Sequence, residues 1–154
     1  MSNYLSSDEE AFIIEPRPLA GFVETPYIKE LTQRALNYIN AGFPVHLRGV
    51  SGTGKTTLAK ALYEELIRYK PRLVLLDGEE LRKMFPAFGY DAVGRVDMGR
   101  TKRAIVALLA GKGCDLIVTG VTWKWETGVR IPGYFPVHLD IPIAECKRRV
   151  GFRR

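Results

Sequence analysis

Short, mainly apolar runs alternate along the chain with longer segments in which apolar residues recur every three or four positions. The runs lie at residues 45–48, 73–76, 115–119 and 135–139. The run LVLL at 73–76 is apolar on both faces, which is typical of a strand in a parallel sheet covered by helices. Strands that alternate with helices predict a three-layer α/β domain with a mainly parallel sheet of about four strands.

The helix-like segments have recognisable starts and stops. Thr25 can cap the first one, and Pro26 then takes the first helical position, where a backbone N–H is not needed. The predicted helices run from Pro26 to Gly42, from Lys55 to Pro71, from Met98 to Ala110 with Gly111 as the stop, and onward from Pro142. Residues 1–20 contain two prolines and show no clear period, so we expect a flexible N-terminal arm ahead of a single domain over residues 21–154.

Composition limits the location and the partners of the protein. The chain has 154 residues, of which 46% are hydrophobic, and no apolar run approaches the ~20 residues that span a bilayer. The polar N-terminus does not resemble a secretory signal, and Cys114 and Cys146 lack metal-ligand spacing, so we expect a cytoplasmic protein with no membrane partner. The net charge of +6 suits nucleic acid or a small anion. Because no helix carries a long basic stripe with interleaved aromatics, we favour a phosphate-bearing small molecule.

A glycine-rich stretch follows the first apolar run. GVSGTGKT at residues 49–56 completes the pattern G-x-x-x-x-G-K-[ST] between a strand and an amphipathic helix, a context that a chance match in a turn would lack. Its backbone N–H groups and the following helix N-terminus favour phosphate. Lys55 is expected to reach the β- and γ-phosphates as a catalytic residue, and Thr56 to ligate Mg²⁺. The predicted ATP-binding residues are Gly49, Ser51, Gly52, Thr53, Gly54, Lys55, Thr56 and Thr57.

Three carboxylates follow the second apolar run, in LVLLDGEE, and two of them, Asp77 and Glu79, are candidate site residues. Asp77 ends the strand that we expect beside the loop strand, so its side chain should face the cleft at the carboxyl ends of the sheet. There it could orient or deprotonate an acceptor hydroxyl as a second catalytic residue, while Glu79 holds Mg²⁺ through water. The alternative is that Asp77 and Gly78 only form a turn that ends the strand.

The front of the chain is similar to one known family. Residues 21–62, GFVETPYIKELTQRALNYINAGFPVHLRGVSGTGKTTLAKAL, closely resemble the start of gas-vesicle protein N, an AAA-type ATPase. The likeness includes the first helix as well as the glycine loop. It does not continue, because the later strand DLIVTG ends without the acidic residues of that family, and no segment matches its helical lid domain.

From about residue 45 on, the chain resembles a second family. The blocks LLDGEELR, FGYDAVGR and HLDIPIAECKRR, together with the glycine loop, look like adenylyl-sulfate kinase, a P-loop kinase that phosphorylates the 3′-hydroxyl of adenosine 5′-phosphosulfate. The resemblance implies that arginines grip the phosphosulfate, that Tyr90 stacks on the adenine of the acceptor and that Arg149 lies near the base of ATP. The implied acceptor-binding residues are Asp77, Glu79, Arg82, Tyr90, Arg95 and Arg100. Solvated arginines and a tyrosine packed in the core are the alternatives.

The chain departs from the kinase pattern in several places. Met98 stands where the family has an asparagine, Trp123 and Trp125 replace residues of the segment I-S-P-Y-R, and Val150 replaces an aspartate. The family continues beyond the position of Arg154 into a lid, a strand and a helix, so we expect a fold shortened at the C-terminus. These differences leave open the acceptor, the role of the tryptophans, and whether a second subunit covers the sheet edge in a homo-oligomer.

The residues and the resemblances together predict a kinase that uses Mg-ATP to phosphorylate a hydroxyl of a small anionic acceptor, in the first place adenosine 5′-phosphosulfate. Two alternatives remain. One is a nucleotide-binding ATPase or assembly protein related to gas-vesicle protein N, and the other is a degenerate P-loop protein without catalysis.

Overall fold

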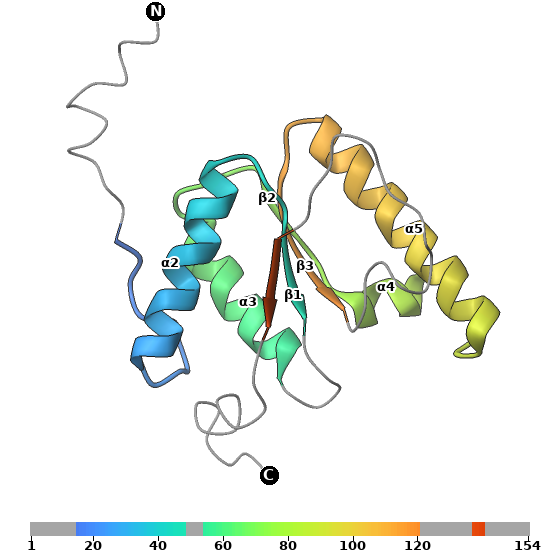
Figure 1. Cartoon of the computed structure of the whole chain (residues 1–154), viewed down its shortest axis with the longest axis horizontal. Coiled ribbons are helices and arrows are strands. Elements are labelled where there is room, and N and C mark those ends of the chain that lie inside the picture. The colour runs from blue at the N-terminus through green and yellow to red at the C-terminus, as the bar shows by residue number, and fades with distance from the viewer. Residues whose placement is uncertain (1–14, 49–53, 121–136, 141–154) are drawn as a thin grey trace, which may run out of the picture.

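The computed structural model describes residues 15–48, 54–120 and 137–140 (Figure 1). Its sheet has four strands, all parallel, in the order β2-β3-β1-β4, which confirms the predicted α/β architecture. The strands are β1 (Val45–Arg48), β2 (Leu73–Leu76), β3 (Asp115–Gly120) and β4 (Val137–Asp140). The first two are predicted to the residue, whereas the first two residues expected in the fourth strand lie outside the described part of the chain.

Four helices are described, and two of them differ from the prediction. They are α2 (Pro26–Asn40), α3 (Lys55–Leu66), α4 (Gly78–Met84) and α5 (Ala92–Gly111). The Thr25 hydroxyl accepts a hydrogen bond from the Ile28 N–H at 3.2 Å, so the predicted cap of α2 is confirmed. Helix α4 was not expected, and α5 begins six residues before Met98, because the Asp91 side chain caps it through the Gly94 N–H at 2.9 Å. The helix expected from Pro142 lies outside the described residues.

The helices cover the two faces of the sheet, which gives the three predicted layers (Figure 1). On one face, α2 and α3 pack on Val45, Leu47 and Ile117 in the larger core cluster. On the other face, Val106 of α5 packs on Leu116 and Val118. None of the described helices is long and apolar enough to cross a bilayer.

The residues before α2 are packed against the domain where the structure describes them. Leu19 is buried in the larger core cluster, and Arg17 donates from its backbone N–H and from Nε to the Glu65 carboxylate of α3, at 2.8 and 3.1 Å. Residues 15–20, which we expected in a flexible arm, are therefore held by the core and by an ion pair. The rest of the expected arm, residues 1–14, lies outside the described part.

Candidate functional site

The carboxyl ends of the parallel strands meet the N-terminus of α3 at one edge of the sheet (Figure 1). Of the predicted glycine loop, the structure describes Gly54 to Thr57; Gly49, Ser51, Gly52 and Thr53 lie outside the described residues, as do Arg149, Trp123 and Trp125. Gly54 is the N-cap of α3 with a φ of 86°, a left-handed conformation that glycine adopts without strain. The N-terminus of α3 lies at this edge, and its partial positive charge favours an anion.

Asp77 connects three elements at this edge. Its side chain is 2% exposed, and Oδ1 accepts hydrogen bonds from the hydroxyls of Thr56 on α3 and Thr119 on β3, both at 2.8 Å. Its Oδ2 accepts the Glu80 N–H at 3.2 Å and so caps α4. The prediction that β2 lies beside the loop strand is wrong, because β3 lies between β1 and β2. The Asp77 side chain nevertheless reaches Thr56 past the end of β3.

The ionisation of Asp77 follows from these contacts. Burial raises the pKa of the carboxyl, whereas the hydrogen bonds from Thr119, Thr56 and the Glu80 N–H and the charge of Lys60 lower it; the net result is a pKa below the usual value. Because hydrogen bonds stabilise the charged form, Asp77 is a carboxylate at neutral pH. Since both of its oxygens accept protein donors and it is nearly inaccessible, it is a poor base in this arrangement.

The same geometry leaves Thr56 suited to a cation. A hydroxyl has one hydrogen and two lone pairs, and the Thr56 hydrogen is directed at Asp77. Two lone pairs of the hydroxyl oxygen then remain as possible ligands of a cation. No cluster of three or more His, Cys, Asp or Glu side chains that could hold a metal occurs among the described residues. Mg²⁺ usually binds through one or two protein groups, substrate phosphates and water.

Arg82 is engaged by the protein itself. Its Nη1 atom donates to the carbonyls of Phe88 and Gly89, at 3.1 and 2.7 Å, and its guanidinium lies 4.2 Å from the ring centroid of Tyr90. These contacts fix the loop between α4 and α5. Tyr90 is 75% exposed, so it is not packed in the core and has surface available for a ligand.

The other predicted acceptor residues differ in their placement. Glu79 is exposed in the first turn of α4, where it is accessible to water or metal. Arg95 and Arg100 are exposed on α5. Arg100 lies midway between the buried residues Met98 and Lys102, hence on the outward side of the helix, which favours the alternative of a solvated arginine. Met98, at the position of the family's asparagine, is buried.

Thr119 is the residue that sequence reasoning missed. The strand DLIVTG was considered only for the acidic residues that it lacks, although a hydroxyl at the end of a central strand is placed to reach the same cleft. Thr119 is 2% exposed and hydrogen-bonds both Asp77 and the backbone N–H of Gly78. The available signal was the polar residue that follows three buried apolar ones.

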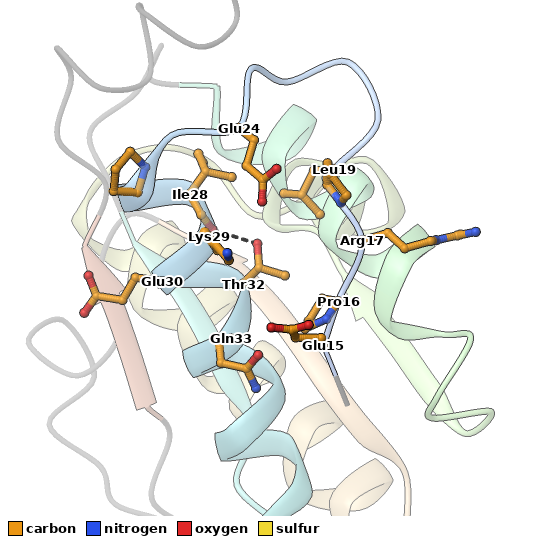
Figure 2. A pocket seen from close by; sticks show the side chains of 12 residues that line it. Glu15, Pro16, Arg17, Leu19, Glu24, Ile28, Lys29, Glu30, Thr32 and Gln33 are labelled. Carbon is orange, nitrogen blue, oxygen red and sulfur yellow. Dashed lines mark hydrogen bonds between the residues drawn. The ribbon is translucent and has the colours of Figure 1, made fainter. Parts of the chain in front are cut away.

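A separate hollow of about 580 Å³ lies between the segment before α2 and α2 itself (Figure 2). Figure 2 shows Glu15, Glu24 and Glu30 around it, with a hydrogen bond from the Thr32 hydroxyl to the Ile28 carbonyl at 2.8 Å on one wall. None of the predicted site residues that the structure describes lines this hollow. It is therefore distinct from the site around Asp77.

Comparisons with known proteins agree with the geometry of the sheet edge. A family model described as adenylylsulphate kinase matches residues 41–150. Cytidine diphosphoramidate kinase of Campylobacter jejuni is 32% identical over 115 residues, 71% of this chain and 67% of that protein. Adenylyl-sulfate kinase of Deinococcus deserti is 33% identical over 116 residues, 72% of this chain and 64% of that one. Gas vesicle ATPase GvpN of Ancylobacter aquaticus is 47% identical over 68 residues, 44% of this chain but only 18% of the ATPase. The chain thus spans about two thirds of these kinases and less than a fifth of the ATPase.

Proposed function

The chain belongs to the adenylylsulphate kinase family, and we propose that it transfers the γ-phosphoryl group of ATP to a hydroxyl of a small anionic acceptor. The observation that carries the proposal is the hydrogen bond from Thr56 to the buried carboxylate of Asp77. Thr56 lies in the first turn of α3, which follows the left-handed Gly54. This arrangement prepares a hydroxyl ligand and a helix N-terminus at the place where the family binds its triphosphate. ATP as the donor also fits the cytoplasmic location expected from the sequence.

Each residue has a role in the proposed transfer. The loop at residues 49–54 and the N-terminus of α3 bind the phosphates, and Lys55 neutralises charge on the group in transit. With Mg²⁺ bound, the charge on the β- and γ-phosphates is neutralised further. Thr56 would be a ligand of that ion, and Asp77 holds Thr56 in place through its hydrogen bond. Because phosphoryl transfer depends mainly on positioning and charge stabilisation, this site requires no strong base.

Glu79 is a carboxylate available for the acceptor side. It is exposed in the first turn of α4, three residues before the Arg82 that fixes the loop carrying Tyr90. We propose that Glu79 orients the acceptor hydroxyl or a metal-bound water, and that Tyr90 provides a stacking surface for a planar group. Arg95 adds positive charge at the start of α5. In this proposal Asp77 acts on Thr56 rather than on the acceptor.

Two acceptors are proposed in order. Adenosine 5′-phosphosulfate is the first, because the family model and several relatives are adenylyl-sulfate kinases at 26–37% identity. Cytidine diphosphoramidate is the second, because the kinase named for it matches to a similar extent. The buried Met98, where the family has an asparagine, is the observation that keeps the second acceptor in consideration.

The test is transfer of labelled γ-phosphate from ATP with Mg²⁺, measured with each acceptor separately and with none. A labelled, phosphorylated acceptor is expected, and its formation should be lost in Lys55→Ala. ATP consumption that is equally fast without any acceptor would instead favour an ATPase, the second candidate, which the 47% identity to the gas vesicle ATPase supports. Binding of ATP without either reaction would support a degenerate P-loop protein.

A further inference from the structure

Thr119 contacts two other elements and the start of a third. It is the penultimate residue of β3, between β1 and β2 in the sheet. Its hydroxyl donates to Asp77 Oδ1 at 2.8 Å and accepts the Gly78 N–H at 2.9 Å, while its carbonyl accepts a hydrogen bond from Lys102 Nζ of α5 at 3.3 Å. The tip of β3 thereby joins the end of β2, the start of α4 and the middle of α5.

The direction of these hydrogen bonds is fixed by the backbone. The Gly78 N–H can only donate, so the single hydrogen of Thr119 is available for Asp77. An ionised carboxylate can only accept, so the Thr56 hydrogen must also be directed at Asp77. The Asp77 carboxylate therefore directs the Thr56 hydroxyl, and Thr119, oriented by the Gly78 N–H, donates to the same Oδ1 atom and helps to hold the carboxylate in place.

We propose that Thr119 is a positioning residue for phosphoryl transfer: it holds the Asp77 carboxylate in place and thereby keeps a lone pair of Thr56 available to bind the Mg²⁺ of a Mg-nucleotide. The role in transfer rests on the proposed function, since it requires a Mg-nucleotide at the site. The action of Thr119 on Asp77 does not rest on the proposed function, because the contacts of Asp77 with Thr119 and with Thr56 exist in the protein without a ligand. The competing role is purely structural, in which Thr119 only attaches β3 to α4.

The packing around Thr119 determines which substitutions are informative. A Cβ added to Gly78 would lie 3.0 Å from the Thr119 carbonyl, so the start of α4 packs closely on the tip of β3. Thr119→Val keeps the shape of the side chain and removes the hydroxyl, whereas Thr119→Ser keeps the hydroxyl and removes the methyl group. Thr119→Ala removes both and replaces the valine variant if that one does not fold. Thr32→Val is the matched control, because it removes another buried threonine hydroxyl, on α2.

The first measurement is the pKa of Asp77 by carbon NMR, with labelled aspartate carboxyls and no nucleotide; the resonance is assigned by its absence in Asp77→Asn. Thr119→Val should raise this pKa by about one unit, the equivalent of one charge-assisted hydrogen bond. Thr119→Ser should restore the original pKa, and Thr32→Val should leave it unchanged. An unchanged pKa in the folded valine or alanine variant would overturn the proposal.

The second measurement is the affinity for ATP with Mg²⁺ and with a chelator instead. Thr119→Val should weaken binding of Mg-ATP by about tenfold and leave metal-free ATP unaffected, which a loss of general stability would not produce. Equal weakening of both forms would show that Thr119 is only structural. If the unmodified protein binds no Mg-ATP, the proposed function fails and the role in transfer fails with it, while the NMR titration still decides whether Thr119 controls Asp77.

Discussion

Asp77→Asn tests whether the buried carboxylate acts on Thr56 or on the acceptor. Asparagine has nearly the same shape, so the change removes the charge and places an amide NH₂ against one of the present donors. If Asp77 holds Thr56 for the metal, the variant should bind Mg-ATP about tenfold more weakly, bind metal-free ATP normally, and transfer phosphate at least ~100-fold more slowly. If Asp77 is a base for the acceptor, transfer falls equally but the affinity for Mg-ATP does not change.

The effect on stability can be worked from the three hydrogen bonds. A hydrogen bond to a charged group contributes about 1.5–3 kcal/mol to stability, and one between neutral groups about 0.5–1.5 kcal/mol. Replacing the carboxylate by an amide therefore reduces the contribution of the two hydroxyl hydrogen bonds by ~2 kcal/mol in total. Loss of the cap on the Glu80 N–H adds ~1 kcal/mol. Because a buried charge is costly, its removal offsets part of this loss in the free energy of unfolding. The free energy of unfolding at neutral pH should therefore fall by about 1–3 kcal/mol.

The pH dependence of the difference in stability between Asp77→Asn and the original protein provides the control. The pKa of Asp77 is lowered in the folded protein, so its stabilisation is fully present above the unfolded pKa of ~3.9 and is lost as the pH falls through the folded value. Urea titrations should show the difference between the two proteins at pH 7 and its decline below about pH 4. Glu79→Gln, an exposed neutralisation two residues away, should leave stability nearly unchanged. A variant as stable as the original at pH 7, with Mg-ATP affinity intact, would refute this account of Asp77.

Three further changes test other parts of the structure. Gly54→Ala should destabilise the protein by about 1–2 kcal/mol and weaken ATP binding, because φ is 86° there, whereas Gly111→Ala in the last residue of α5 should not destabilise in a urea titration. Glu65→Gln should lower the free energy of unfolding by about 1–3 kcal/mol at pH 7. Burial raises the pKa of Glu65, whereas hydrogen bonds from Arg17 and Tyr69 lower it, and the net pKa is below its usual value. The loss of stability in Glu65→Gln should therefore shrink below about pH 4. Glu64→Gln, at an exposed position, should show no such loss. Arg82→Ala should raise the KM for the acceptor about tenfold with the KM for ATP unchanged, because it releases the loop that carries Tyr90; Lys83→Ala is the exposed control, and an unchanged acceptor KM would contradict this role.

The elements that the sequence predicted correctly are those with a local cause. The cap at Thr25 and the apolar run at 73–76 define α2 and β2 within a few residues. Helix α4 has seven residues, too few to show a period, and it begins where Asp77 caps it. The first turns of α5, AVGRVD, have no apolar stripe, because the Asp91 cap rather than packing starts that helix. Local patterns therefore predict elements that bury a face, and miss those that a single side chain initiates.

The site was predictable only in part, for a different reason. The prediction placed Asp77 at the carboxyl ends of the strands, where the structure also has it, but did not include its hydrogen bond with Thr56. The contact with Thr119 joins residues 42 positions apart. It depends on β3 lying between β1 and β2, which no local pattern encodes. The incorrect assumption that β2 adjoins β1 concealed the strand end that completes the site.

The packing of helix α2 bears on the two family resemblances. The kinase family model starts at residue 41, yet α2 before it buries six residues and its Tyr27 hydroxyl donates to the Asp140 carbonyl at the end of β4, at 2.6 Å. Asp140 in turn pairs with Arg48, the last residue of β1. The helix shared with the gas-vesicle resemblance is thus part of the same folded unit as the kinase segment. Strand β1, the glycine loop and α3 would serve either reaction. The decision between kinase and ATPase therefore depends on β2, α4 and α5, where a phosphoryl acceptor would bind. An ATPase needs no acceptor site there, because it transfers the phosphoryl group to water.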